Sequence, residues 1–146
     1  FLADLIRDLE ESNEQHPESD RIQWIVDFLD VGSYVPQGDG SGRMVSSKEV
    51  RIFRDVKTPL AGEHVLIIED VADTCRTLAK VREHISAHEP ASLKIAVLLR
   101  KSGSEVDVPL DFVALETRGN VYVVGYGLDS EGRFRGLSYI GAVVES

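Results

Sequence analysis

The sequence has little cysteine, no long hydrophobic run and a shortage of cations, and each of these excludes a class of protein. Its single cysteine, Cys75, can form no internal disulfide, and zinc sites built from four cysteines are impossible. No apolar stretch approaches the ~20 residues that span a bilayer, and no signal-peptide pattern opens the chain. We therefore expect a protein of the reducing cytoplasm that does not enter a membrane.

The shortage of positive charge excludes a further group of partners. Lys and Arg number 16 against 25 Asp and Glu, which gives a formal net charge of -9 at pH 7. Such a surface repels the phosphates of nucleic acids and of acidic membranes, so no nucleic-acid partner is expected. A small polyphosphate still binds where backbone N–H groups, a few local cations and Mg²⁺ converge.

Hydrophobic periodicity predicts a single α/β domain over the 146 residues. An amphipathic helix opens the chain at 1–10, and a second helix is expected at 74–88. Strands are expected at 22–28, 50–56, 64–68, 93–99, 111–115, 121–126 and 139–144. The buried strand at 64–68, the helix after it and the buried strand at 93–99 form a βαβ unit, whose ligands gather beyond the carboxyl ends of its parallel strands.

Residues 33–48, SYVPQGDGSGRMVSSK, concentrate Gly, Ser and Pro in a stretch longer than an ordinary connection. This composition predicts a mobile active-site lid or a linker, and the loop is expected to join two antiparallel strands. The GDGSG run within it lacks the strand-to-helix context of a dinucleotide-binding loop, so flexibility is the better interpretation.

The chemistry is concentrated in residues 65–78, VLIIEDVADTCRTL. An apolar strand ending in two acids also describes the magnesium-binding strand of P-loop nucleotidases, but the phosphate loop GxxxxGK[ST] is absent from this sequence. Here a second polar turn opens directly into a helix. Its backbone N–H groups and the hydroxyls of Thr74 and Thr77 suit a phosphate dianion, and Glu69 and Asp70 suit sugar hydroxyls. Taken alone, Asp73 is equally typical of a helix N-cap.

This stretch resembles the signature of the type I phosphoribosyltransferases, which is an apolar strand, two acids, two spacers, Asp-Thr, a small residue, any residue and Thr. The resemblance implies an α/β fold with a mostly parallel sheet, flanking helices and a small hood built partly from the C-terminal strand. It implies that Glu69 and Asp70 bind the ribose hydroxyls and that Asp73 is the general base. The implied 5′-phosphate site is Asp73, Thr74, Cys75, Arg76 and Thr77, where Cys75 replaces the glycine common in the family.

Four further features extend the resemblance to the hypoxanthine-guanine branch. They are VVGYGLD at 123–129, a lysine at position 101 after a strand, Arg135, and the pair Ser33-Tyr34 in the flexible loop. In that branch, Lys101 is implied to meet the purine 6-oxygen, Tyr122 to stack on the ring, and main chain near Val123 to contact the base. Asp129 is implied to bind a second Mg²⁺ and Arg135 the pyrophosphate. Singly, such charges are more often surface residues, and such an aromatic more often belongs to a core. The four histidines show no zinc-enzyme motif and are interpreted as solvated.

The implied reaction transfers 5-phosphoribosyl from 5-phosphoribosyl-1-pyrophosphate to guanine or hypoxanthine, with xanthine as a third candidate, in a Mg²⁺-dependent homodimer or homotetramer. Two rivals stay open: a non-catalytic nucleotide sensor, and a transferase for another base such as adenine or orotate. The resemblance also leads us to expect a first strand and a pyrophosphate loop ahead of Phe1, so that 1–146 is a single domain lacking its N-terminal part.

Overall fold

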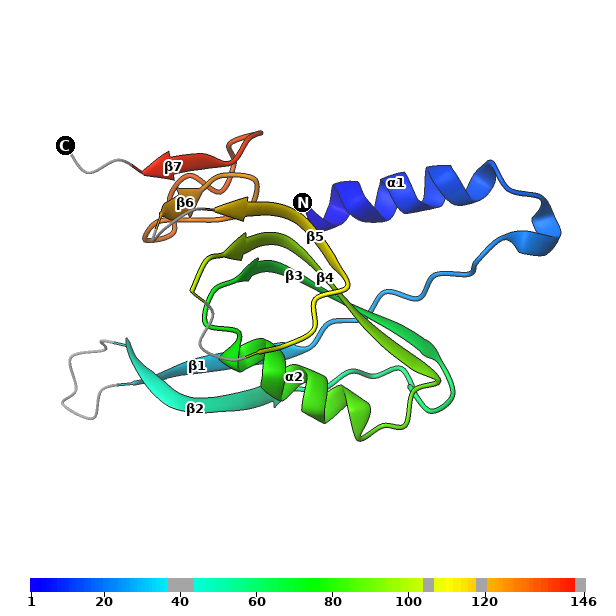
Figure 1. Cartoon of the computed structure of the whole chain (residues 1–146), viewed down its shortest axis with the longest axis horizontal. Coiled ribbons are helices and arrows are strands. Elements are labelled where there is room, and N and C mark those ends of the chain that lie inside the picture. Colours follow the sequence, from blue (N-terminus) through cyan, green and yellow to red (C-terminus); the bar gives the residue numbers. More distant parts are fainter. Residues whose placement is uncertain (37–43, 104–106, 118–120, 144–146) are drawn as a thin grey trace.

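A three-stranded parallel sheet forms the centre of the computed structural model, which describes residues 1–36, 44–103, 107–117 and 121–143 (Figure 1). Its strands are β3 (His64–Ala72), β4 (Ser92–Lys101) and β5 (Phe112–Thr117), in the order β3-β4-β5. Both pairings are parallel, and the register places Ala72 beside Arg100 and Lys101 beside Thr117. The carboxyl ends of all three strands therefore share one edge, as the βαβ pattern predicted.

Helix α2 (Arg76–Ser86) returns the chain from β3 to β4 and carries the core. Its buried residues are Leu78, Val81 and Ile85, which recur at helical spacing. Leu78 packs with Ile95 and Val97 of β4. Val81 and Ile85 form a second cluster with Leu60, against which Val31, Val65, Ile67 and Leu93 pack. The helix is thus held between the parallel sheet and the strand that contains Val31.

That strand, β1 (Asp30–Pro36), pairs antiparallel with β2 (Met44–Arg54), which confirms the expected pair of antiparallel arms. A Cβ on Gly32 would lie 2.8 Å from the ring of Phe53 of β2, so a larger residue there would require this exposed ring to move. The two strands occupy much of 33–48, with Tyr34 beside Ser46 in the register. The predicted lid residues 37–43 lie outside the described residues, as do the side chains of Ser33 and Tyr34.

The strand expected at 22–28 is wrong. Residues 21–29 form neither helix nor strand, and the ladder begins only at Asp30, which pairs with Arg54. Alternating apolar residues suggested a strand, but here the alternation has no partner to supply hydrogen bonds. Ile22, Ile25 and Phe28 are exposed instead.

A hood follows the sheet. Strands β6 (Tyr122–Val124) and β7 (Gly141–Val143) pair antiparallel, joined by an irregular segment that begins at Gly125. Gly125 has φ +92°, and a Cβ there would overlap the carbonyl oxygen of Tyr139, so the turn requires glycine. The hood built partly from the C-terminal strand and the α/β class, both expected from the sequence, are confirmed.

Helix α1 (Leu2–Glu14) is attached to the hood at its first turn, and a short 3-10 helix, η1 (Glu18–Asp20), follows it. The rings of Phe1 and Tyr126 lie 6.2 Å apart, and the Tyr126 hydroxyl donates a hydrogen bond of 2.8 Å to Asp4. The expected amphipathic character of α1 is confirmed, because Leu2, Leu5, Ile6 and Leu9 are all half-buried. The helix start thereby lies beside the carboxyl edge of the sheet.

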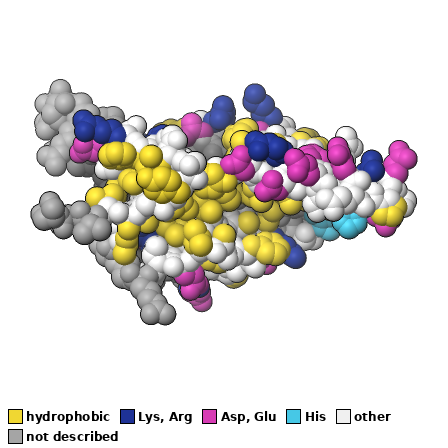
Figure 2. All heavy atoms as spheres, turned by 90° about the horizontal axis from the view of Figure 1, so that it is seen from above, with side chains coloured by type: hydrophobic (Ala, Val, Ile, Leu, Met, Phe, Trp, Pro, Cys, Tyr) yellow, Lys and Arg dark blue, Asp and Glu magenta, His cyan; other side chains and the backbone are white. Residues whose placement is uncertain are grey.

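Figure 2 views the molecule from the top of Figure 1 and shows hydrophobic side chains gathered on that face, with charged groups beside them. The parts that Figure 1 places at the top include β5, which exposes Phe112 and Leu115, and the hood, which exposes Tyr122, Phe134 and Tyr139. Within the described ranges, no helix combines the length and apolar character needed to span a bilayer.

Candidate functional site

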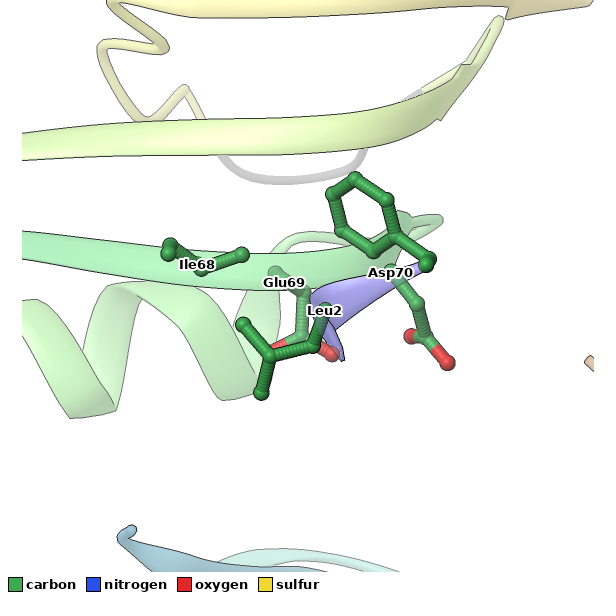
Figure 3. A pocket seen from close by; sticks show the side chains of 5 residues that line it. Leu2, Ile68, Glu69 and Asp70 are labelled. Carbon is green, nitrogen blue, oxygen red and sulfur yellow. The ribbon is translucent and has the colours of Figure 1, made fainter. Parts of the chain in front are cut away.

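The acid pair predicted to bind a sugar lies near the carboxyl end of β3. Glu69 and Asp70 line a pocket of about 260 Å³ together with Ile68 of the same strand and Phe1 and Leu2 from the start of α1. Figure 3 shows both carboxyl groups extending to the same side of β3, with Leu2 beside Glu69. The two acids thus present four carboxyl oxygens at one end of one strand.

Burial, together with the negative charge and the hydrogen bond of Asp70, raises the pKa of Glu69 to about 7. The apolar side chains of Phe1 and Leu2 line the pocket beside this carboxyl group, and apolar surroundings disfavour its charged form. Near neutral pH, Glu69 therefore divides between a protonated form, which donates to Asp70, and an ionised form, which only accepts hydrogen bonds.

The turn after β3 leads into the N-terminus of α2. Thr74 is exposed and Thr77 is half-buried, while Cys75 is buried, with 6% of its surface exposed. Cys75 has φ 59° and ψ 7°, the left-handed conformation that glycine adopts without strain. The structure thus gives a physical reason for the glycine that the family commonly has here. The first N–H groups of a helix have no partner within it and attract anions, so the turn is suited to a phosphate.

Lys101, at the end of β4, links this turn to the hood. Its Nζ lies 3.3 Å from Oδ2 of Asp73, and only 13% of its side chain is exposed. The same Nζ lies 5.9 Å from the ring centroid of Tyr122, a distance typical of a cation–π contact. The Tyr122 hydroxyl donates to the carbonyl oxygen of Asp129 at 3.1 Å, so Tyr122 makes one contact through its ring and another through its hydroxyl.

Asp129 and Arg135 form a second fixed unit in the hood. Arg135 Nη2 lies 2.7 Å from Asp129 Oδ1, and its Nη1 donates to the carbonyl oxygen of Gly127 at 2.7 Å. The other carboxylate oxygen of Asp129 accepts from the backbone N–H of Gly132 at 2.6 Å. Both side chains are therefore oriented before any ligand arrives.

One open pocket of about 180 Å³ joins six of the predicted site residues. It is lined by Asp70, Val71, Lys101, Tyr122, Val123, Leu128, Asp129 and Arg135. Asp73 reaches this group through Lys101, and Glu69 reaches it through Asp70, which lines both pockets. The structure therefore gathers the side chains predicted for the sugar, the base and the pyrophosphate, and it places Ser33 and Tyr34 on β1.

Sequence reasoning missed five residues that line these two pockets, namely Phe1, Leu2, Ile68, Val71 and Leu128. Leu128 lies within the VVGYGLD stretch, and its apolar character was the available signal. Nothing in the sequence indicated that α1 meets β3, because Leu2 and Glu69 are far apart along the chain. Such a contact becomes visible only in three dimensions.

The residues around the pocket fit a hard dication. Asp70 and Asp129 both line the second pocket and offer carboxylate oxygens, the ligands that Mg²⁺ prefers. No sulfur or imidazole ligand lines either described pocket. Although both oxygens of Asp129 already accept a bond, each keeps a further lone pair.

Many α/β proteins bind phosphorylated ligands at the carboxyl edge of a parallel sheet. The features described here are typical of that class: an acid pair near a strand end, a helix N-terminus beside it, and a lysine in cation–π contact with an aromatic ring. Comparison with known proteins narrows this class. The family model for the phosphoribosyl transferase domain matches residues 3–131. The chain therefore belongs to the phosphoribosyltransferase family.

Similar proteins come from the same branch of that family. The chain is 41% identical over 145 residues to hypoxanthine phosphoribosyltransferase of Escherichia coli K12, covering 99% of this chain and 71% of the relative. It is 39% identical to hypoxanthine-guanine phosphoribosyltransferase of Bacillus subtilis, covering 98% and 70%. A variant of Trypanosoma cruzi hypoxanthine phosphoribosyltransferase, solved as a ternary substrates complex, superposes with a TM-score of 0.79 at 36% identity, covering 99% and 70%. The resemblance to the type I fold and to the hypoxanthine-guanine branch is thus confirmed.

Proposed function

We propose that this chain transfers 5-phosphoribosyl from 5-phosphoribosyl-1-pyrophosphate to guanine or hypoxanthine, forming the nucleoside 5′-monophosphate and pyrophosphate, as in purine salvage. The observation that carries this proposal is the contact of Lys101 with both Asp73 and the Tyr122 ring, next to the acid pair. The same function is named for relatives at 41% and 39% identity. Catalysis is favoured over sensing because a candidate base and its positioning cation are both in place.

The sugar side of the reaction is assigned to the end of β3 and the start of α2. Ionised Glu69 and Asp70 accept hydrogen bonds from the ribose 2′- and 3′-hydroxyls. The N–H groups of the turn 73–77 and the hydroxyls of Thr74 and Thr77 hold the 5′-phosphate, helped by the helix dipole. With its 2′- and 3′-hydroxyls and its 5′-phosphate held in this way, the sugar leaves C1 unbound by the protein and facing the hood.

The base side is assigned to Lys101 and the hood. The Lys101 ammonium donates to the purine 6-oxygen, Tyr122 stacks on the ring, and main chain near Val123 contacts the base edge. Asp73 removes the N7 proton as N9 attacks C1, a role typically worth ~10²–10⁴-fold in rate. Lys101 Nζ, 3.3 Å from Asp73 Oδ2, holds this carboxylate beside the base site.

The leaving pyrophosphate gains negative charge as the bond at C1 breaks, and Arg135 is assigned to stabilise it. Asp129 holds Arg135 at 2.7 Å, which fixes the guanidinium toward the pocket. Asp129 in the hood and Asp70 on the sugar side would hold Mg²⁺. When bound, Mg²⁺ would neutralise negative charge on the pyrophosphate. We further propose that the 33–48 segment, with Ser33 and Tyr34 on β1, closes over the site to exclude water.

A substrate panel tests the proposal. The chain, with Mg²⁺ and 5-phosphoribosyl-1-pyrophosphate, is offered hypoxanthine, guanine, xanthine, adenine or orotate, and both nucleotide and pyrophosphate are measured. We expect turnover with hypoxanthine or guanine. Turnover only with adenine or orotate would contradict the base assignment, and tight binding of the sugar donor without any pyrophosphate release would identify a sensor.

We also propose that the chain works as a homodimer or homotetramer. Four large apolar side chains on the unpaired segment, Ile22, Ile25, Val26 and Phe28, are exposed, and such contiguous apolar surface usually belongs to an interface. Sedimentation of the wild type and of Ile25→Lys tests this proposal. We expect a dimer or tetramer for the wild type and a smaller species for the variant, and a monomeric wild type would contradict the proposal.

A further inference from the structure

A cluster of metal-ligating side chains lies at the other end of α2 from the phosphate turn. His84 belongs to the last turn of α2, His88 follows in the turn after the helix, and Asp55 comes directly after β2. At 1.5 Å per residue, His84 lies roughly 13 Å along the helix axis from Cys75. None of the three residues lines either of the pockets described above.

The three side chains converge on one point. His84 Nε2 lies 2.9 Å from Asp55 Oδ1, His88 Nε2 lies 3.8 Å from Asp55 Oδ2, and the two Nε2 atoms are 3.5 Å apart. The interpretation of these histidines as solvated is wrong for His84, which keeps 26% of its side chain exposed and contacts Asp55. The i, i+4 spacing placed both rings on one side of the helix end, but no sequence pattern indicated that Asp55 would meet them.

The spacing suits a four-coordinate ion. Bonds of about 2.0–2.2 Å in a tetrahedral arrangement place neighbouring ligand atoms about 3.3–3.6 Å apart. His84 Nε2 lies 2.9 Å from Asp55 Oδ1 and 3.5 Å from His88 Nε2, and His88 Nε2 lies 3.8 Å from the other carboxylate oxygen. One ligand atom from each of the three residues can be chosen so that all three lie within 4.8 Å of one another. Side-chain rotations alone would therefore bring the ligand atoms around one cation.

An ordinary hydrogen bond between His84 and Asp55 explains only part of this arrangement. It leaves His88 Nε2 facing His84 Nε2 at 3.5 Å, although His84 Nε2 already faces the carboxylate. A bound cation would engage both ring nitrogens and the carboxylate at once.

We propose that Asp55, His84 and His88 form a site for a transition-metal dication of the Zn²⁺ class, separate from the catalytic Mg²⁺ site, with water completing the coordination. Two imidazoles and one carboxylate suit Zn²⁺ and Co²⁺ and disfavour Mg²⁺, which prefers oxygen ligands. The ion would join the end of β2 to the end of α2, next to Val56, which packs against the second apolar cluster that contains Val81 and Ile85. Metal binding therefore stabilises the fold, since the ligands do not converge in the unfolded chain.

The test measures Zn²⁺ binding by calorimetry and Co²⁺ binding by its visible spectrum, in a weakly alkaline buffer without chelators. Asp55→Asn, His84→Gln and His88→Gln each remove one ligand. His16→Gln removes an exposed histidine outside the cluster, and Asp129→Asn alters the proposed Mg²⁺ site. His88→Gln is the most informative ligand variant, because 37% of that side chain is exposed and the change disturbs little packing.

We expect one strongly bound Zn²⁺ per chain and the absorption of four-coordinate Co²⁺. His88→Gln should weaken binding by about 100-fold or more, since even the partners of metal ligands contribute about 10–100-fold. Zn²⁺ should raise the thermal midpoint of the wild type but not that of His88→Gln. His16→Gln and Asp129→Asn should bind as the wild type does. Unchanged binding in His88→Gln, or binding lost in Asp129→Asn, would overturn the proposal.

Discussion

Cys75 offers a substitution whose energy terms can be separated by two variants. The residue combines two opposing features, a buried side chain and a left-handed backbone with φ 59°. Its side chain packs with Ala72, Leu78, Ile95 and Val97 in the first core cluster. Cys75→Ala removes the sulfur and keeps the backbone strain, whereas Cys75→Gly removes the whole side chain and the strain together.

The magnitudes follow from this difference. Loss of the buried sulfur should destabilise Cys75→Ala by about 1–2 kcal/mol. Glycine loses one more carbon, about 0.8 kcal/mol, and gains unfolded-state freedom worth about 0.5–1 kcal/mol. Relief of left-handed strain returns about 1–2 kcal/mol. These last terms nearly cancel, so Cys75→Gly should be about as stable as Cys75→Ala despite its smaller side chain.

Urea unfolding of both variants and the wild type, followed by circular dichroism, measures these differences. Equal slopes in urea are required for the comparison to be valid. We also expect Cys75→Gly to keep phosphoribosyl transfer, because the thiol has no assigned role in the reaction. A glycine variant less stable than the alanine variant by more than about 1.3 kcal/mol would show that no strain is released there, and would refute the reasoning.

Two further variants test the sugar and base sides of the pocket. With its pKa at about 7, Glu69 becomes ionised as pH rises, so its share of sugar-donor binding should increase about tenfold between roughly pH 6 and 8. In a binding titration, Glu69→Gln should show only the pH dependence of the sugar donor itself. Equal pH dependence of donor binding in the wild type and in Glu69→Gln would contradict the assignment of Glu69 to the sugar site. The raised pKa also means that the wild type loses stability as pH rises through about 7. In thermal melts, the midpoint of Glu69→Gln should therefore rise relative to that of the wild type at about pH 8. Lys101→Met should lower kcat/KM for hypoxanthine by roughly 10–150-fold, the loss of one charged hydrogen bond worth about 1.5–3 kcal/mol. Lys94→Met, which removes an exposed cation 5.6 Å from the centroid of the Phe112 ring, is the matched control, and an equal effect there would remove the special role of Lys101.

Local sequence patterns predicted the parts of the fold that depend on neighbouring residues. The strand that carries the acid pair, the helix after the polar turn and the antiparallel arms were all expected, because periodicity and turn chemistry determine them locally, although the strand is mostly half-buried and continues past the acids to Ala72. The segment 21–29 was mispredicted because its apolar alternation is satisfied by no partner strand. Strand pairing is a long-range property that periodicity alone does not report.

The candidate site shows the same division. The motif at 65–78 and the resemblance together named most of the pocket residues, including Lys101 and Tyr122. What they left out was geometry: the contact of Lys101 with Asp73, the pairing of Asp129 with Arg135, and the cover that Phe1 and Leu2 place over Glu69. These contacts join segments far apart in sequence, so they arise only once the sheet and hood are assembled.

The central claim is that this pocket performs phosphoribosyl transfer with Asp73 as its general base. The most direct measurement is single-turnover formation of nucleotide from hypoxanthine and 5-phosphoribosyl-1-pyrophosphate by wild type, Asp73→Asn and Asp8→Asn, the last being an exposed aspartate on α1. We predict that Asp73→Asn lowers the chemical rate by ~10²–10⁴-fold while donor binding persists, and that Asp8→Asn reacts like the wild type. Equal rates for Asp73→Asn and the wild type would contradict the account.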